Sequence, residues 1–261
     1  MNEIGARIAQ FNAANDDDDD RIFFLADTCQ SIGHLDIDVQ MMQCSGLVAT
    51  GRKYLRGPRG TGFLHIPETI SQLLWPHHID HYGAPVSTVP NANDIHTPLE
   101  QNNVLSFAPR YGARRFEFWE SNIAGRLGLG QALEETLTLG QSNITSTIME
   151  RTNYLVDKLR QLEGVKLHHT PECGIVTFWV STIESSRLAA KLQSPVPLSS
   201  SSLQDDVVAF EVSVVPATST PLDSAVTGVP DLLRTSVSYT TTNREIDLLC
   251  EILAQILIES K

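Results

Sequence analysis

A short apolar run that stops at an acidic residue is the feature that most constrains this chain. The run covers residues 22–26 (IFFLA) and ends at Asp27. A run without polar alternation is typical of a strand buried on both faces, as in sheets that are largely parallel. A second run, residues 47–49 (LVA), ends at Thr50, and a third, residues 63–66, follows a turn rich in glycine and proline. This order predicts an α/β layer with a largely parallel sheet.

Helical periodicity surrounds these predicted strands, beginning with a short amphipathic helix near the start of the chain. The later predicted elements are helices at residues 120–137 and 144–162, a strand at residues 174–180 and a helix at residues 245–257. We therefore predict two regions. Residues 1–135 form part of a large domain, and residues 136–261 form a smaller α/β domain.

The charge of the chain argues against several functional classes. Its 261 residues carry 19 Lys+Arg against 31 Asp+Glu, a net charge of −12. A nucleic-acid binder is not expected, because such proteins present a basic face. No apolar run approaches the roughly 20 residues of a membrane helix, and the first residues lack the apolar core of a secretory leader. We expect a globular protein located in the cytoplasm.

The cysteines and histidines form no standard metal motif. The four cysteines are scattered, without a CxxC pair. His77, His78, Asp80 and His81 are close in sequence, but their spacing fits no standard metal site. We therefore predict no metal site.

Polar residues come directly after the first two predicted strands. Asp27 follows one strand, and Thr50, Arg52 and Lys53 follow the next. Open α/β sheets bind ligands at the carboxyl edge of their strands, so both groups are expected to face one crevice. On chemistry alone, two interpretations of the acid and the lysine stay open: a binding site and a plain ion pair.

Three motifs in this region narrow the choice: DTCQ at residues 27–30, TGRK at residues 50–53 and GPRG at residues 57–60. Their order and spacing resemble the cofactor-binding segment of the class V aminotransferase family. That family consists of fold-type I pyridoxal-phosphate (PLP) enzymes and includes cysteine desulfurases. The resemblance implies the same α/β fold, with an incomplete large parallel-sheet domain and a small C-terminal α/β domain.

The resemblance also implies a role for each motif residue. Lys53 would be the catalytic residue, joined to PLP as a Schiff base, and would move the proton at the α-carbon of the substrate. Asp27 would pair with the ring nitrogen of PLP, and Gln30 would hydrogen-bond its phenolic oxygen. Thr50 and Arg52 would contact the phosphate.

Two later segments extend the resemblance. Arg234, in an Arg-x-Ser sequence, would hold the α-carboxylate of the substrate, with a surface ion pair as the alternative. Asn122 ends the segment of residues 114–122, which in the family reaches the cofactor phosphate of a dimer partner. The start of an ordinary amphipathic helix explains this segment nearly as well.

The chain also departs from the family in two ways. Family members have a long segment before the aspartate that completes the cofactor pocket, and little chain precedes Asp27 here. We therefore expect an N-terminally truncated form with open sheet edges and exposed apolar faces. A desulfurase also presents a cysteine thiolate on a loop that corresponds to residues 196–222, where this chain has none. Desulfurase activity is therefore not expected.

The expected activity is that of a PLP-dependent, aminotransferase-like enzyme that acts on an amino acid. One alternative is a PLP-dependent C–S lyase similar to sulfoxide lyases. The other is a non-catalytic fragment that needs a partner chain. The expected partners are an amino-acid substrate and a second chain, either in a homodimer or as the source of the missing segment. Neither a nucleic acid nor a membrane is an expected partner.

Overall fold

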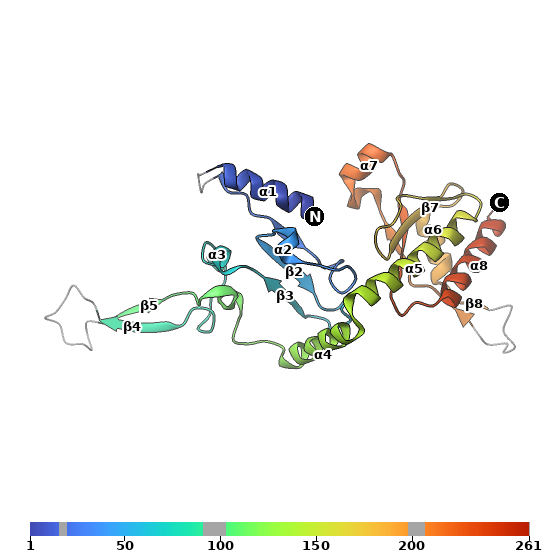
Figure 1. The fold of residues 1–261 in the computed structure, drawn as a ribbon. Coiled ribbons are helices and arrows are strands. Elements are labelled where there is room, and N and C mark those ends of the chain that lie inside the picture. Colours follow the sequence, from blue (N-terminus) through green and yellow to red (C-terminus); the bar gives the residue numbers. More distant parts are fainter. Residues whose placement is uncertain (16–19, 91–102, 198–206, 261) are drawn as a thin grey trace. The chain divides into compact units, whose positions relative to one another are not determined.

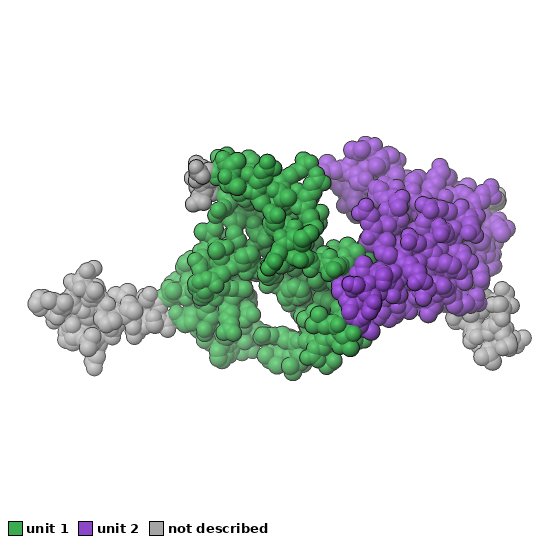
Figure 2. Space-filling view, viewed as in Figure 1, with its two compact units in different colours: residues 1–138 green, residues 139–261 purple. Residues whose placement is uncertain are grey.

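The computed structural model describes residues 1–15, 20–90, 103–197 and 207–260 (Figure 1). The chain divides into two compact units, unit 1 (residues 1–138) and unit 2 (residues 139–261), coloured separately in Figure 2. A membrane-spanning helix is not found among the described residues, since none of their helices is both long and apolar enough.

Unit 1 consists of short strands and helices followed by one long helix. In chain order its elements are α1 (Asn2–Ala14), β1 (Leu25–Asp27), α2 (Val39–Met42), β2 (Gly46–Thr50), β3 (Gly62–His65), α3 (Glu68–Ser71), β4 (Val86–Pro90), β5 (Asn103–Phe107), the 3-10 helix η2 (Gly112–Phe116) and α4 (Ile123–Leu139), which ends at the boundary between the units.

The sheet that carries the predicted site has the order β1-β2-β3. β1 pairs with β2 in parallel, with Ala26 opposite Leu47, whereas β3 runs antiparallel to β2. The sheet is therefore mixed, and only one of its two strand pairs has the parallel direction expected from the sequence. A parallel return needs a crossover of about a dozen residues or more, usually helical, and no helix lies between β2 and β3.

β1 is less covered than its apolar sequence predicted. Ala26 is buried against the sheet, but Phe23 and Leu25 are 45% and 62% exposed. Among the described residues, β1 pairs only with β2 and forms the edge of the sheet. The expectation of burial on both faces is therefore wrong for this strand, whereas the open edge and exposed apolar side chains agree with the sequence analysis.

Unit 2 is larger in its core and richer in helix. Its elements are α5 (Gln141–Arg160), β6 (Val165–Leu167), β7 (Ile175–Val180), α6 (Ser185–Gln193), β8 (Val196–Pro197), β9 (Val207–Val208), β10 (Ser213–Val215), the 3-10 helix η3 (Ala217–Ser219), α7 (Pro221–Thr227), β11 (Leu232–Ser236) and α8 (Asn243–Glu259). The helices predicted at residues 120–137, 144–162 and 245–257 are confirmed as α4, α5 and α8.

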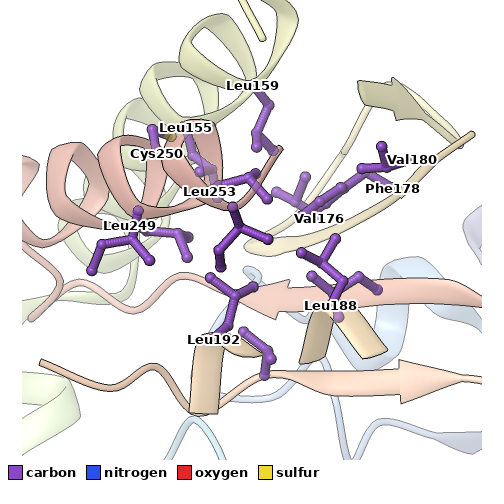
Figure 3. Packing of buried hydrophobic residues seen from close by; sticks show 14 of the residues in the cluster. Leu155, Leu159, Val176, Phe178, Val180, Leu188, Leu192, Leu249, Cys250 and Leu253 are labelled. Atoms are coloured by element: carbon purple, nitrogen blue, oxygen red, sulfur yellow. The ribbon is translucent and has the colours of Figure 1, made fainter. Parts of the chain in front are cut away.

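The core of unit 2 lies between helices and a four-stranded antiparallel sheet of order β10-β11-β7-β6. Figure 3 shows leucines of α5, α6 and α8 converging on side chains of β7, among them the fully buried Phe178. On α8, the buried side chains recur at helical spacing, which explains the amphipathic pattern in the sequence. They are Ile246, Leu249, Cys250, Ile252, Leu253, Ile256 and Leu257.

Candidate active site at the carboxyl edge of unit 1

The parallel pair of strands brings two predicted site residues to one edge of the sheet. Asp27 is the last residue of β1 and Thr50 the last of β2. Asp27 lies opposite Val48 in the parallel register, so both strands end at the same side. The next residue, Thr28, ties the two strands together there, because its N–H and its hydroxyl both donate to Val48 O at 2.9 Å.

A tight turn after β2 carries Lys53. The Gly51 N–H donates to Thr61 O at 2.9 Å, and the Gly57 N–H donates to Gly51 O at 2.7 Å. A Cβ atom on Gly51 would overlap Thr61 Oγ1 and would approach the Leu129 side chain of α4 to 2.8 Å. Only glycine fits this position, and the close packing fixes the backbone on which Lys53 sits.

α4 supports the turn, and Asn122 caps that helix. The Asn122 side chain accepts a hydrogen bond from the Gly125 N–H at 2.8 Å, which satisfies a donor in the first turn of α4. Asn122 therefore acts at the start of a helix, as one of the two interpretations of the sequence had it. Its contribution to a cofactor site stays a prediction.

Asp27 is held in its charged form. Its Oδ1 accepts from the Cys29 N–H at 2.9 Å. Hydrogen bonds from the Cys29 thiol and backbone hold the pKa of Asp27 below its usual range, and the positive charge of Lys53 acts in the same direction. The hydrogen bond from the Cys29 thiol to Asp27 also raises the pKa of that thiol, which keeps this cysteine protonated and poorly nucleophilic.

Lys53 and Arg52 reach this edge without fixed partners. Lys53 is half-buried and Arg52 is exposed. In the part of the chain that the structure describes, neither side chain forms a hydrogen bond or an ion pair. Asp27 and Lys53 influence each other electrostatically but form no salt bridge, so the plain ion pair considered from the sequence is not observed.

The other two predicted residues also lie at these strand ends. Gln30 is half-buried in the turn after β1, where its backbone carbonyl accepts from the imidazole of His34. The Thr50 hydroxyl donates to Thr61 O over 3.4 Å, a long contact that a better acceptor would replace at little cost. The structure thus places Asp27 and Thr50 at the ends of two adjacent strands of one sheet, with Gln30, Arg52 and Lys53 in the turns that follow.

His34 is a supporting residue that the sequence did not reveal. It is fully buried, and its ring contacts that of Tyr54, the residue after Lys53, with centroids 4.1 Å apart. Burial lowers the pKa of His34, so the imidazole is neutral at neutral pH. Nothing in the local sequence signals this role, because the contact joins two turns that are distant along the chain.

Arg234 belongs to unit 2, where it lies on β11 opposite Thr177 of β7. Its Nη2 donates to Ser236 Oγ over 3.4 Å. No carboxylate among the described residues forms an ion pair with its guanidinium, so the surface ion pair considered from the sequence is not observed. Its role toward a substrate carboxylate stays a prediction.

Asp80, in the group of residues 77–81, stabilises the turn that follows it. Asp80 Oδ1 accepts from the N–H groups of Tyr82 and Gly83, and its Oδ2 accepts from the Trp119 N–H. These bonds hold the pKa of Asp80 below its usual range, with the Trp119 bond as the largest cause. Its oxygens are thus occupied by backbone donors.

Comparison with known proteins decides the family. The model of the family "Aminotransferase class-V" matches residues 2–249. The chain belongs to this family. The resemblance found in the three motifs is therefore confirmed, and the family is one of PLP-dependent enzymes.

Curated relatives of this class-V chain are cysteine desulfurases. This chain is 27% identical over 235 residues to a probable cysteine desulfurase of Methanothermobacter thermautotrophicus, and the match covers 89% of this chain and 52% of that protein. It is 30% identical over 179 residues to the cysteine desulfurase of Yersinia pseudotuberculosis, covering 68% and 39%. The chain thus spans about half or less of the length of these relatives.

Solved structures show the same fold. The cysteine desulfurase CsdA of Escherichia coli has a TM-score of 0.73 at 18% identity, covering 98% of this chain and 55% of that one. A C-DES mutant with glycine linked to its PLP cofactor has a TM-score of 0.61 at 22% identity, covering 86% and 49%. The fold-type I class expected from the sequence is confirmed, with mixed and antiparallel sheets in the described residues.

Proposed function

We propose that this class-V chain binds PLP at the carboxyl edge of the β1–β2 pair, with Lys53 bonded to it, and acts on an amino acid. One observation carries the proposal. Asp27, an ionised carboxylate, ends one of two adjacent parallel strands. Lys53 follows the other strand and forms no hydrogen bond or ion pair with described residues. The carboxyl edge of a parallel sheet is where such folds bind ligands.

The chemistry of the residues at this edge fits PLP. Asp27, whose pKa is lowered, is suited to hold a proton on a pyridine nitrogen. The hydroxyl of Thr50 and the guanidinium of Arg52 offer a neutral and a charged donor to a phosphate. The amide of Gln30 is able to donate to a phenolic oxygen. A different kind of group is thus available for each polar feature of the cofactor.

When bound, PLP supplies an electron sink that lets a proton leave the α-carbon of an amino acid. Lys53 is the base that takes this proton and returns it, since its half-buried amine lies on a rigid turn. Arg234 orients the substrate by binding its α-carboxylate through two parallel N–H donors.

Two reactions are candidates. Amino-group transfer corresponds to the description of the family. Cleavage of a C–S bond is favoured by the relatives, which are named cysteine desulfurases, and by a structural neighbour described as a cystine C–S lyase. A persulfide on a cysteine of residues 196–222 is not part of the proposal, because this segment has no cysteine.

Product analysis separates the two reactions. The PLP-loaded chain is incubated with cystine or cysteine, and separately with an amino acid and an oxo-acid acceptor. Lyase activity gives pyruvate, ammonia and the released sulfur fragment, which is cysteine persulfide from cystine or sulfide from cysteine, whereas transfer gives a new oxo acid and an aminated acceptor. Arg234 is also tested in these assays, because its loss affects substrate use in either case.

Cofactor binding is tested by titrating the full chain with PLP while visible absorbance is followed. We expect a band in the wild type that borohydride removes, with the reduced cofactor then found on the peptide that contains Lys53. Lys53→Ala removes the band, whereas Lys166→Ala, at an exposed lysine of β6, keeps it. A folded wild-type protein without the band, or an equal band in Lys53→Ala, contradicts the proposal.

A second chain is part of the proposal. The uncovered edge of β1, with Phe23 and Leu25 exposed beside it, supports pairing with another polypeptide, because such edges are otherwise prone to aggregate. A homodimer in the cytoplasm is the assembly that we propose first. Light scattering during size-exclusion chromatography measures it directly, and a monomer at all concentrations argues against it.

A further inference from the structure

Two histidines and an aspartate converge in unit 2. His168 and His169 follow β6, and Asp223 lies in α7. His168 Nε2 is 2.8 Å from Asp223 Oδ2, and the centroids of the two imidazole rings are 3.6 Å apart. One potential ligand atom from each residue lies within 4.8 Å of the others. Across the described ranges, no other set of three or more His, Cys, Asp or Glu side chains meets so closely.

We propose that His168, His169 and Asp223 bind a borderline divalent metal ion, of the kind represented by Zn²⁺ and Co²⁺. Imidazole nitrogens together with a carboxylate oxygen are a ligand set that such ions prefer. In a tetrahedral site with metal–ligand bonds of about 2.0–2.2 Å, two ligand atoms on one ion lie about 3.3–3.6 Å apart. The most widely separated of the three ligand atoms therefore need to close by up to about 1.5 Å.

The positions of both imidazole rings support binding to one shared metal ion. Both histidines follow β6, and the His168 N–H donates to Thr177 O at 3.0 Å. The hydrogen bond between His168 and Asp223 and the contact between the two imidazole rings keep the three side chains together. A ligand atom from each residue therefore lies within reach of one ion.

Burial and access also suit a metal site. The His168 side chain is only 5% exposed and that of Asp223 is 37% exposed, while His169 lies at the surface. A cavity of about 600 Å³ is lined by all three residues and by Glu172 and Cys173. Three protein ligands beside such a cavity leave a position for water or for a further ligand.

Titration of the full, untagged chain with Co²⁺, in the absence of PLP, tests the proposal. Co²⁺ is used because its visible spectrum reports the coordination, and omission of PLP keeps the result independent of the proposed cofactor site. We expect one ion per chain, displaced by Zn²⁺, and a melting temperature that rises with Zn²⁺.

Two variants locate the site. His169→Gln changes an exposed ligand, and Asp223→Asn keeps an oxygen that accepts the hydrogen bond from His168 but removes the charge. Each should weaken Co²⁺ binding by about tenfold or more, since a ligand is lost or neutralised. Circular dichroism checks that both variants fold.

The matched control is the double variant His77→Gln/His78→Gln. These residues are an exposed pair of neighbouring histidines in unit 1, with ring centroids 4.5 Å apart. Binding should be unchanged in this variant. Absence of binding in the wild type, unchanged affinity in both unit 2 variants, or loss of the bound ion in the control would each overturn the proposal.

Discussion

Asp27, the last residue of β1, accepts a hydrogen bond from the backbone N–H of Cys29 at 2.9 Å. The carboxylate is thus oriented by its own chain two residues later, at the edge where β2 also ends. This local bond, together with that from the Cys29 thiol, keeps an exposed acid ionised.

The charge of Asp27 leads to a prediction for cofactor binding. Asp27→Asn should weaken the binding of PLP at neutral pH by about tenfold, because a charge-assisted hydrogen bond becomes a neutral one. In the wild type, the lowered pKa of Asp27 should let binding persist down to the ordinary carboxyl value of about 3.9, and binding should fall only at lower pH, as the carboxylate is protonated. Absorbance titrations across this pH range measure both effects. Asp36→Asn, at an exposed aspartate of unit 1, is the control and should bind normally.

Arg234 should affect the substrate and not the cofactor. We expect Arg234→Gln to raise KM for an amino acid by about 10- to 100-fold, the effect of losing charged hydrogen bonds to a carboxylate. The affinity for PLP should stay the same. Arg187→Gln changes an exposed arginine of α6 and should alter neither quantity. An unchanged KM in Arg234→Gln would remove this residue from the site.

Two glycines should respond to alanine in opposite directions. A Cβ atom on Gly5 of α1 would overlap the carbonyl oxygen of Met42, at the end of α2. Gly5→Ala should therefore lower the free energy of unfolding by about 1–3 kcal/mol. Gly130 lies inside α4 with open space around its Cα, so Gly130→Ala should raise that free energy by up to about 1 kcal/mol. Urea unfolding of the two variants checks the sign of each change.

The core of unit 2 predicts a contrast along one helix. Leu253 on α8 is fully buried, so Leu253→Ala should lower the free energy of unfolding by about 2–5 kcal/mol. Ile258 on the same helix is 73% exposed, and Ile258→Ala should change it by less than about 0.5 kcal/mol. Thermal and urea unfolding followed by circular dichroism measure both. Similar losses in the two variants would contradict the packing described for α8.

A capping box begins α8. The Glu245 N–H donates to Thr242 Oγ1 at 3.2 Å, and the Thr242 N–H donates to Glu245 Oε2 at 2.7 Å. Thr242→Ala should lower the free energy of unfolding by about 1 kcal/mol. A matched change, Thr138→Ala, removes a threonine that caps no helix start and should have a smaller effect.

The same box should depend on pH. The backbone hydrogen bond from Thr242 is the largest cause that lowers the pKa of Glu245 in the folded protein. Its stabilisation is therefore present above the unfolded value of about 4.3 and is lost as the pH falls through the lower folded value. Glu245→Gln should remove this part of the acid sensitivity, which unfolding curves between about pH 3 and pH 7 would reveal. An identical pH profile in Glu245→Gln would show that the box does not titrate with folding.

Several features of the fold could be predicted because their signals are local. The apolar runs that end at Asp27 and Thr50 indicated two strands and the edge at which they finish. The periodicity along residues 245–257 indicated a helix with one buried face, which is α8. The motifs around Asp27 and Lys53 indicated the family that the comparison confirms.

Other features depend on which segments meet, and no local pattern carries that information. The sequence did not reveal that β3 returns antiparallel to β2 or that His34 contacts Tyr54. The contact of His168 with Asp223 joins residues 55 positions apart.

The sequence by itself therefore determined the types of element, the family and the residues at the strand ends. These follow from periodicity and from chemistry within a few neighbouring residues. Only the tertiary structure decided strand direction and the partner of each polar side chain. Those properties arise from contacts between distant segments, whose free energy depends on packing of the whole unit and not on local preference.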